Sequence, residues 1–493
     1  MDMTVRTKSG SVQVERHDMF IGGKPTPSAT GNYFPVLNPA TEEVIAEVAE
    51  GNGTDVDRAV AAAEAGFEVW SHLTAYKRSR VLYDLARALE DRGEEFAALE
   101  CRNQGKPIRH VRGFDIPNAI ETLDYYAGMA TKVQGVTLDT APAMYNYVRR
   151  EPYGVVGQII PWNYPIMMAA WKIAPALAAG NAVVIKPAPY TPLTLLRFAA
   201  LARDAGLPDG VLNVVTGMGP VVGRAITRHP RIAKIAFTGS TATGRDVAAN
   251  ANETHKPVIL ELGGKSANIF FDDVDLDGAL KRAVLGIFHN AGQMCIAGSR
   301  LLVHEKIHDT FIARMAAYAK IMKIGDPADE KTQLGPVVAA RQLERVLGFI
   351  ERGRKSGATL VAGGGRPAAP QRGYYVEPTI FTGVDPTSEL AQEEIFGPVA
   401  CVFKFRDEAE AIKLANNTKF GLAAGIHTND ISRAHRMAGM LKAGTIWINT
   451  YAYLTPMAPY GGYRESGYGR ELGFQGIENY TQVKSVFIGP GRA

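Results

Sequence analysis

The chain has little cysteine and no long apolar run. Without a CxxC pair or another zinc-ligand spacing, we expect neither disulfides nor a structural metal. No apolar stretch follows the polar start Met1–Asp18, and Lys172 interrupts the apolar run 166–179 before it reaches the length of a membrane span. We therefore expect a cytoplasmic protein without a membrane partner. The three cysteines lie far apart, at Cys101, Cys295 and Cys401.

A surplus of one charge is also absent. Lysine and arginine number 54 against 50 aspartates and glutamates, a net charge of +4, and neither sign forms a long block. Charge therefore gives no reason to expect a nucleic-acid partner and favours a small molecule. The hydrophobic fraction of 46% and the charged fraction of 21% are those of a globular protein. The length suffices for two or three domains of about 150 residues each.

From Gly154 onward, short apolar runs alternate with helical segments. This alternation predicts a parallel sheet joined by right-handed crossovers, which is a Rossmann-like unit. The apolar runs are 155–160, 182–185, 212–215, 232–237 and 258–262. The helical segments between them are 165–179, 192–205, 221–228 and 243–252.

Helical periodicity also covers 55–70 and 77–103, before the alternating region. A second α/β set after Gly263 predicts another domain, whereas 363–372 has the composition of a surface loop. The candidate strands of this second set are 268–271, 300–303, 400–405, 423–427 and 445–449.

The signal for nucleotide binding is indirect, because no GxGxxG follows the first candidate strand. Gly239 and Ser240 instead lie between a strand and a helix, where backbone N–H groups can approach a phosphate. The same Gly-Ser turn is also a common structural connection, so both interpretations stay open. Lys186 ends the second strand, at the sheet edge where ligands bind, and can bond a ribose hydroxyl. A solvated lysine is the alternative.

Three further residues are suited to covalent chemistry. Cys295 follows an apolar helical stretch and a glycine-bearing loop that can expose its sulfur, although a lone cysteine is often inert. Glu261 stands in an apolar strand, where burial would raise its pKa and suit a general base. Asn163 follows the first strand and can donate a hydrogen bond to an oxyanion, or serve as a turn residue or N-cap.

Five motifs then bring these residues together. They are Pro161–Pro165, Phe237–Ser240, Leu260–Lys265, Gly292–Cys295 and Glu393–Pro398. In this order and spacing they resemble the NAD(P)-dependent aldehyde dehydrogenase superfamily, and the pattern is nearest to betaine-aldehyde and aminoaldehyde members. The similarity extends from Asn38–Thr41 to Gly467–Gly473, which is nearly the whole chain.

The resemblance implies an α/β fold with three parts. A Rossmann-type cofactor domain is expected over 1–121 and 152–262, and a second α/β catalytic domain over 263–474. A small β bridging element, expected to serve oligomerisation, is assigned to 122–151 and 475–493. Homodimers or homotetramers are usual in the family.

The resemblance also implies a mechanism. The Cys295 thiolate attacks the aldehyde, while Asn163 and the backbone N–H of Cys295 stabilise the oxyanion. Hydride leaves for the nicotinamide, and Glu261 deprotonates the water that hydrolyses the thioester to a carboxylic acid. Lys172 and Glu471 stand at the family's proton-relay positions.

For the cofactor, the resemblance implies NAD, with Lys186 and Glu394 on the ribose hydroxyls and Phe396 beside the nicotinamide. Gly239 and Ser240 are expected at the pyrophosphate. The cleft is lined by Ile159, Pro161 and Trp162.

Pro189 departs from the family pattern, because NAD-preferring members often have glutamate there. A glutamate would bond the ribose diol and repel a 2′-phosphate, whereas proline does neither, so the sequence leaves NADP use open.

The substrate is only dimly indicated. Tyr164, Trp171 and Tyr460 match an aromatic box whose ring faces attract cationic aldehydes, although such rings also serve neutral aldehydes. Asn118 matches a tunnel-mouth position and slightly favours a polar or cationic substrate. A cysteine hydrolase and a non-catalytic binding or structural protein on the same scaffold are the competing functions. A coenzyme-A-acylating enzyme is disfavoured, since that branch typically lacks the glutamate matched by Glu261.

Overall fold

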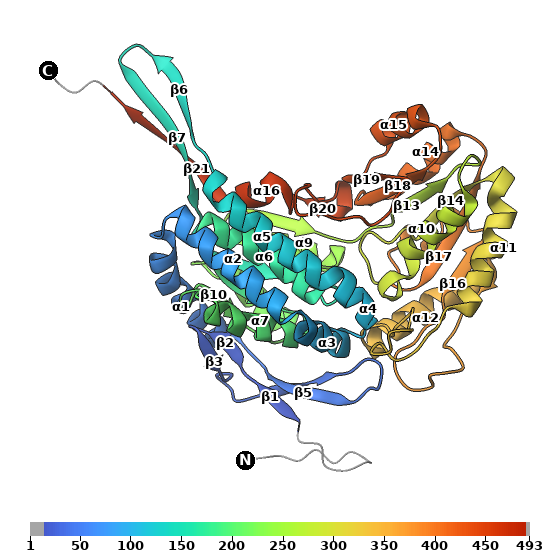
Figure 1. Ribbon diagram of the computed structural model, residues 1–493, viewed down its shortest axis with the longest axis horizontal. Helices are drawn as coiled ribbons and strands as arrows, with labels where there is room; N and C mark the ends of the chain where they lie inside the picture. The colour runs from blue at the N-terminus through green and yellow to red at the C-terminus, as the bar shows by residue number, and fades with distance from the viewer. Residues whose placement is uncertain (1–13, 490–493) are drawn as a thin grey trace.

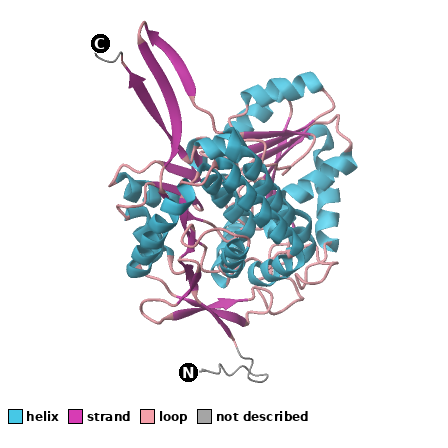
Figure 2. Cartoon of the chain, turned by 60° about the vertical axis from the view of Figure 1, so that its left-hand side comes forward, coloured by secondary structure: helices cyan, strands magenta, loops and turns pink. Residues whose placement is uncertain are grey.

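The computed structural model describes residues 14–489 and contains two large, mostly parallel sheets with helices packed around them, from which a narrow three-stranded arm projects (Figures 1 and 2). Residues 1–13 and 490–493, which the predicted domain limits include, lie outside the described residues. No helix between residues 14 and 489 combines the length and the apolar character that a bilayer crossing needs.

The first large sheet has a parallel centre with antiparallel strands on both sides. In spatial order its strands are β20 (Gly467–Tyr468), β12 (Val258–Glu261), β11 (Lys234–Thr238), β8 (Val155–Ile159), β9 (Ala182–Lys186), β10 (Leu212–Val214), β2 (Met19–Ile21) and β3 (Lys24–Thr26). The five strands from β12 to β10 are parallel, which confirms the predicted sheet. The flanking strands β20 and β2 run antiparallel to their neighbours.

Helices of the N-terminal half pack with this sheet. They are α1 (Gly53–Ser71), α2 (Ala75–Asp91), α3 (Gly93–Gln104), α4 (Ile108–His110), α5 (Ile116–Met129), α6 (Pro165–Ala179), α7 (Leu193–Asp204), α8 (Arg224–Arg228) and α9 (Thr241–Asn252). The single helix predicted over 77–103 is wrong. Arg92 leaves helical geometry with φ −112° and ψ 17°, and Gly93 then starts a separate helix. The helix predicted from Val221 is preceded by a π-helical turn, Gly219–Gly223.

The second large sheet is parallel except at one edge. In spatial order it contains β15 (Thr359–Ala362), β16 (Thr379–Thr382), β17 (Val399–Phe405), β14 (Arg300–His304), β13 (Ala267–Phe270), β18 (Ala423–His427) and β19 (Thr445–Ile448). All five strands predicted for this half are present, and β15 and β16 are additions, with β15 antiparallel. The segment 363–372 forms no helix or strand, as predicted.

Helices also accompany the second sheet. They are α10 (Leu276–Phe288), α11 (Glu305–Ile321), α12 (Ala340–Lys355), α13 (Glu389–Gln392), α14 (Glu408–Asn416), α15 (Ile431–Met440) and α16 (Gly473–Glu478). A small N-terminal sheet contains β1 (Glu15–His17), β5 (Val44–Ala49) and β4 (Tyr33–Leu37).

The projecting arm is an antiparallel sheet of β21 (Thr481–Ile488), β7 (Met144–Pro152) and β6 (Val136–Ala141), with β7 in the centre. It stands away from the rest of the molecule in both views (Figures 1 and 2). The segment 122–151 therefore includes the end of α5 as well as two strands of the arm.

Helix α6 positions much of the site, and every one of its residues is buried. It starts at Pro165, whose fixed φ suits the first helical position. It ends at Gly180, whose φ of +98° terminates the helix in the left-handed conformation. A helix this apolar on all sides belongs in a protein core. Lys172 is its one charged residue.

Candidate active site

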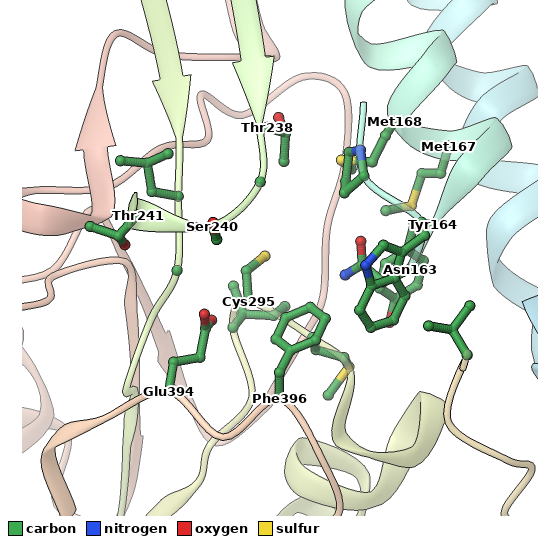
Figure 3. Close-up of a pocket in the computed structure, with 18 of the residues that line it drawn as sticks. Asn163, Tyr164, Met167, Met168, Thr238, Ser240, Thr241, Cys295, Glu394 and Phe396 are labelled. Carbon is green, nitrogen blue, oxygen red and sulfur yellow. The ribbon is translucent and has the colours of Figure 1, made fainter. Parts of the chain in front are cut away.

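A cavity of about 1030 Å³ brings together segments of both large sheets. Cys295 lies between Ser240 and Glu394 on one side and Asn163 and Tyr164 on the other (Figure 3). The predicted residues that line the cavity are Pro161, Trp162, Asn163, Tyr164, Trp171, Gly239, Ser240, Cys295, Glu394, Phe396 and Tyr460. The remaining predicted residues, all within the described range, do not line it. They are Asn118, Ile159, Lys172, Lys186, Pro189, Glu261 and Glu471.

The loop before Cys295 takes an unusual path. Asn290 and Ala291 have positive φ angles of 49° and 53°, and Gly292 follows with 71°. A side chain at Gly292 would collide with the carbonyl group of Gly397. Glycine at this position therefore lets the loop pack against the segment that carries Phe396.

The Cys295 thiol is enclosed by the protein. Its Sγ lies 3.1 Å from the hydroxyl oxygen of Tyr460, and burial raises the pKa of the thiol to about 12. The sulfur therefore holds its proton near neutral pH in this state. A nearby base or positive charge must lower the cost of the thiolate before the sulfur can attack.

Asn163 is fixed beside the same loop. Its Nδ2 donates to the carbonyl oxygen of Gln293 at 2.9 Å, and its own backbone carbonyl accepts from Nδ2 of Asn290 at 2.9 Å. An amide nitrogen carries two hydrogens, so the bond to Gln293 leaves one for another acceptor. This arrangement suits an oxyanion donor.

Glu261 is the last residue of β12 and is buried. Neither of its carboxylate oxygens has a hydrogen-bond partner within the described part of the chain. Burial, followed by the nearby Glu471 carboxylate, raises the pKa of Glu261 well above its ordinary value. A carboxyl group in this environment can exchange a proton near neutral pH.

A buried ion pair adjoins Glu261. Nζ of Lys172 donates to Oε1 of Glu471 and, at 2.6 Å, to the Thr238 hydroxyl. The backbone of Glu471 also pairs with that of Tyr460 through bonds of 2.7 and 2.8 Å. The two predicted relay residues are thus connected to the tyrosine that contacts the thiol.

Two charged residues stand ready on the cofactor side. Nζ of Lys186 donates to the carbonyl of its neighbour Pro187 at 2.9 Å, and burial lowers the pKa of Lys186 to about 8. Burial raises the pKa of Glu394 to about 7, although Oε1 accepts from the Gly264 N–H at 3.0 Å. The side chains of Ile159 and Lys186 come no closer than 3.8 Å to a methyl group placed on Gly223. This leaves space over the turn.

Gly239 and Ser240 connect β11 to α9. A side chain at Gly239 would lie 2.5 Å from the Phe237 ring, so the turn needs glycine. The Ser240 hydroxyl caps α9 by accepting from the Thr243 N–H at 3.3 Å. The backbone N–H groups that begin this 12-residue helix face the cavity side where an anion is favoured.

Phe396 has a positive φ of 61°, which is uncommon for a bulky residue. Its carbonyl oxygen accepts from Nε2 of Gln342 at 2.6 Å, and its ring meets the Trp162 ring edge-on at 5.2 Å. Two aromatic walls of the cavity are therefore held against each other. Pro189 is half-buried and Ile159 is buried at the end of β8.

The predicted aromatic box has a different backing from the one expected. Trp171 and Tyr460 pack with ring centroids 5.1 Å apart, and both line the cavity. Asn118 is buried behind Trp171, because its Oδ1 accepts from the indole Nε1 at 2.7 Å. Its position supports the tryptophan and does not form a tunnel mouth.

The sequence did not single out several residues of the cavity and its surroundings. Nζ of Lys106 lies 3.5 Å from the centroid of the Tyr164 ring and is paired with buried Asp115. Met167 and Met168 project from α6 (Figure 3). Other lining residues are Arg109, His110, Phe114 and His289. They come from segments far apart in the chain, and no motif or periodicity marked them.

Comparisons with known proteins agree with this site. The sequence model of the Aldehyde dehydrogenase family matches residues 26–486. An aldehyde dehydrogenase of Emericella nidulans is 48% identical over 477 residues, which are 96% of this chain and 95% of that protein. A structure of a Bacillus cereus aldehyde dehydrogenase in complex with NAD⁺ is 46% identical, with a TM-score of 0.95, and the match covers 96% of this chain and 97% of that chain.

A betaine aldehyde dehydrogenase point mutant of Staphylococcus aureus, solved with NAD⁺ and a BME-modified cysteine, is 39% identical, with a TM-score of 0.94 over 96% of each chain. These similarities confirm the predicted fold class of two α/β domains and a small β element. The chain belongs to the aldehyde dehydrogenase family.

Proposed function

We propose that the chain oxidises an aldehyde to its carboxylic acid through a covalent bond to Cys295, with NAD as cofactor. Family membership makes the chain an aldehyde-oxidising dehydrogenase that uses a nicotinamide dinucleotide. The observation that carries the residue assignment is the position of the Cys295 sulfur. It lies in a cavity shared with Asn163, close enough to the buried Glu261 for the two groups to interact electrostatically.

The first step uses the thiol and the amide. Cys295 loses its proton and its sulfur adds to the carbonyl carbon, which turns the carbonyl oxygen into an oxyanion. The remaining Nδ2 hydrogen of Asn163 and the Cys295 backbone N–H stabilise that charge. NAD⁺, when bound, supplies a positive ring beside the thiol and accepts the hydride that converts the adduct to a thioester.

The second step uses Glu261. Its free carboxylate oxygens accept a proton from water, and the hydroxide adds to the thioester carbon. The C–S bond then breaks and releases the acid. Glu471 and Lys172 adjoin Glu261 and provide an outward route for its proton.

The residues of the cofactor side fit a dinucleotide. Lys186 has a buried amine bonded only to an adjacent carbonyl, and Glu394 presents a carboxylate to the cavity, so both can bind ribose hydroxyls. Gly239 and the N-terminus of α9 suit the pyrophosphate. The two crystallised relatives named above contain NAD⁺. We propose NAD as the preferred cofactor, with the margin over NADP narrowed by Pro189.

The cavity rings favour an aldehyde with a flat or apolar body. Tyr164, Trp171 and Tyr460 all line the cavity. Amino and betaine-type aldehydes are a weaker proposal, since Lys106 already places a cation on one face of Tyr164.

The same proposal extends to the whole chain. The first sheet with its helices, 1–121 and 152–262, forms the cofactor domain, and 263–474 forms the catalytic domain. The arm, with 122–151 and 475–493, joins copies of the chain into a homodimer or homotetramer. We propose the cytoplasm as its compartment, from the low cysteine content.

The test is NADH absorbance during turnover of benzaldehyde by the wild type and by Cys295→Ala. We expect the variant to lose turnover and to keep measurable NAD⁺ binding, because the thiol supplies the covalent bond and the cofactor contacts lie elsewhere. A cysteine hydrolase would instead release acid from an ester without any need for NAD⁺ or any NADH. A non-catalytic protein would do neither. Retained oxidation in Cys295→Ala would refute the nucleophile assignment.

A further inference from the structure

Three nitrogen-bearing side chains gather on one part of the cavity wall. Arg109, His110 and His289 all line the cavity, and the two imidazole rings lie 4.3 Å apart, tilted by 31°. Arg109 and His110 belong to α4, whereas His289 follows α10, so the fold brings together two distant segments. None of the three takes part in the mechanism proposed above.

These side chains offer hydrogen-bond capacity that the protein does not use. Arg109 has no ion-pair or hydrogen-bond partner among residues 14–489, and it is exposed at the edge of the cavity. His110 Nδ1 is a buried atom without a partner in the same range. Buried polar atoms are usually paired, so such an atom in a cavity wall points to a ligand.

The electrostatic surroundings of this group are positive. Burial is the main cause that lowers the pKa of His110 to about 3, and the charges of Arg109 and Lys106 lower it further. Burial likewise lowers the pKa of His289, helped by the same two cations and by His110. Both rings are therefore neutral near pH 7, and each keeps one N–H to donate. An anion entering this space would find donors and a favourable potential.

The carboxylates of the cavity wall are engaged elsewhere. Glu393 is paired with Lys419 at 2.6 Å and Glu465 with Arg245 at 3.0 Å. Glu394 accepts from the Gly264 N–H. No other described Asp or Glu lines the cavity. A cationic end of a substrate would therefore meet Arg109 without a carboxylate to balance it.

A series of rings connects this group with the reactive end of the cavity. The Phe114 ring lies 6.1 Å from the His289 ring and 6.2 Å from the Tyr164 ring, edge-on in both cases. Tyr164 directly follows the oxyanion donor Asn163 in the chain. A flat substrate body can lie along these rings, with its aldehyde at Cys295 and its other end toward Arg109.

We propose that Arg109, His110 and His289 form a binding site for a carboxylate at the end of the substrate opposite the aldehyde. The preferred substrates are then aromatic aldehydes that carry a carboxylate. This inference rests on the proposed function, in which Cys295 receives the aldehyde carbon. Arg109 supplies the charge, and the two histidines supply directed N–H donors.

The test compares three para-substituted benzaldehydes with NAD⁺: 4-carboxybenzaldehyde, benzaldehyde and 4-(trimethylammonio)benzaldehyde. We expect the highest kcat/KM for the carboxylate and the lowest for the cation, each about tenfold from benzaldehyde. The trimethylammonio group withdraws electrons and makes its aldehyde the most electrophilic of the three. An order that follows charge therefore cannot arise from intrinsic reactivity.

Variants assign the preference to residues. Arg109→Gln should reduce the ratio of kcat/KM for 4-carboxybenzaldehyde over benzaldehyde by roughly tenfold, mostly through KM, and leave benzaldehyde turnover unchanged. His289→Phe, which keeps a ring, should lower the same ratio. Arg102→Gln is the matched control, because Arg102 is exposed on α3 outside the cavity wall and should leave the ratio unchanged.

Binding without turnover gives a second readout. Calorimetric titration should show terephthalate binding about tenfold more tightly than benzoate to the wild type, and equally to Arg109→Gln. If benzaldehyde is oxidised but the carboxylate gives no advantage, or the advantage survives Arg109→Gln, the carboxylate site is wrong and the proposed function stands. If none of the three aldehydes is oxidised, the proposed function fails first, and this inference fails with it.

Discussion

At the scale of single residues, burial has opposite consequences for the two groups that we assign to the chemistry. It raises the pKa of both the Cys295 thiol and the Glu261 carboxyl. For the thiol, this keeps the nucleophile protonated until a positive charge approaches. For the glutamate, it moves proton exchange toward neutral pH, where a general base is most effective. One enclosed cavity thus prepares the base and restrains the nucleophile.

The role of Glu261 predicts a specific kinetic change. Glu261→Gln keeps the side-chain shape but cannot take a proton from water, so thioester hydrolysis should slow by about 100-fold while acylation continues. Rapid mixing should then show a burst of NADH before a slow steady state. Glu253→Gln, an exposed residue after α9, is the control and should behave as the wild type. Slowed acylation without a burst would mean that Glu261 activates Cys295 and not water.

Glu100 gives a prediction about stability. It is fully buried, both of its oxygens accept from the Ile166 N–H at 3.2 and 3.3 Å, and burial followed by the Asp115 charge raises its pKa to about 8. The native state therefore holds a proton that the unfolded chain releases near 4.5. The stabilisation is complete below that pH and is lost as the pH rises toward about 8.

Glu100→Gln removes this titration and keeps a carbonyl acceptor for Ile166. The stability of the wild type relative to the variant, measured by urea unfolding, should fall steadily from about pH 5 to about pH 8 and then level off. Exposed Glu68→Gln should give a constant difference over the same range. A constant difference for Glu100→Gln would show that the carboxyl group is ionised in the native state at all these pH values.

At the scale of elements, α6 shows how well local signals can work. The predicted range 165–179 is the observed one, since proline at the first position, glycine after the last and a continuous apolar pattern all agree. The prediction over 77–103 failed because periodicity continues across the one-residue break at Arg92. The strands β15 and β16 were missed, and their short segments carry no strong alternation.

The candidate site follows the same division. The motif residues Asn163, Cys295 and Glu394 all line one cavity, as the family resemblance implied. His110 and His289 meet only because α4 and the turn after α10 are adjacent in the fold. A single sequence holds no local signal for such a pair, and the burial that sets their pKa values also arises from tertiary packing.

The turn before Cys295 gives a prediction at the same scale. Gly292→Ala requires a methyl group in collision with the Gly397 carbonyl, in addition to an unfavourable positive φ. Gly357 also has a positive φ, of 85°, but has open space around it. We expect Gly357→Ala to destabilise the protein by about 1 kcal/mol and Gly292→Ala by about 1 to 3 kcal/mol more, with loss of activity. Urea unfolding and NADH production measure the two effects. Equal destabilisation would mean that the two segments separate easily.

At the scale of the whole molecule, the arm is the feature that a single chain explains least. Its three strands project from the body and carry many exposed apolar side chains (Figure 1). A small isolated sheet is marginal in water, and its edge strands β6 and β21 present unpaired backbone groups. The exposed apolar residues of the arm are Val136, Leu138, Met144, Tyr145, Val483, Phe487 and Ile488. Their number favours the proposal that the arm contacts another copy of the chain.

The last prediction follows from the period of two along β21. Val483 and Phe487 are four residues apart and therefore share one face of the strand, where they are 61% and 60% exposed. If this face is buried between copies, replacing both by lysine removes at least about 3 kcal/mol of apolar burial per protomer and weakens the oligomer by roughly 100-fold or more. Light scattering after size exclusion should then show monomers at concentrations where the wild type is oligomeric. Gln482→Lys adds a charge to the opposite face of the same strand and should leave the mass unchanged. A double variant with the wild-type mass, or a monomeric wild type, would exclude this face of the arm as the contact between copies.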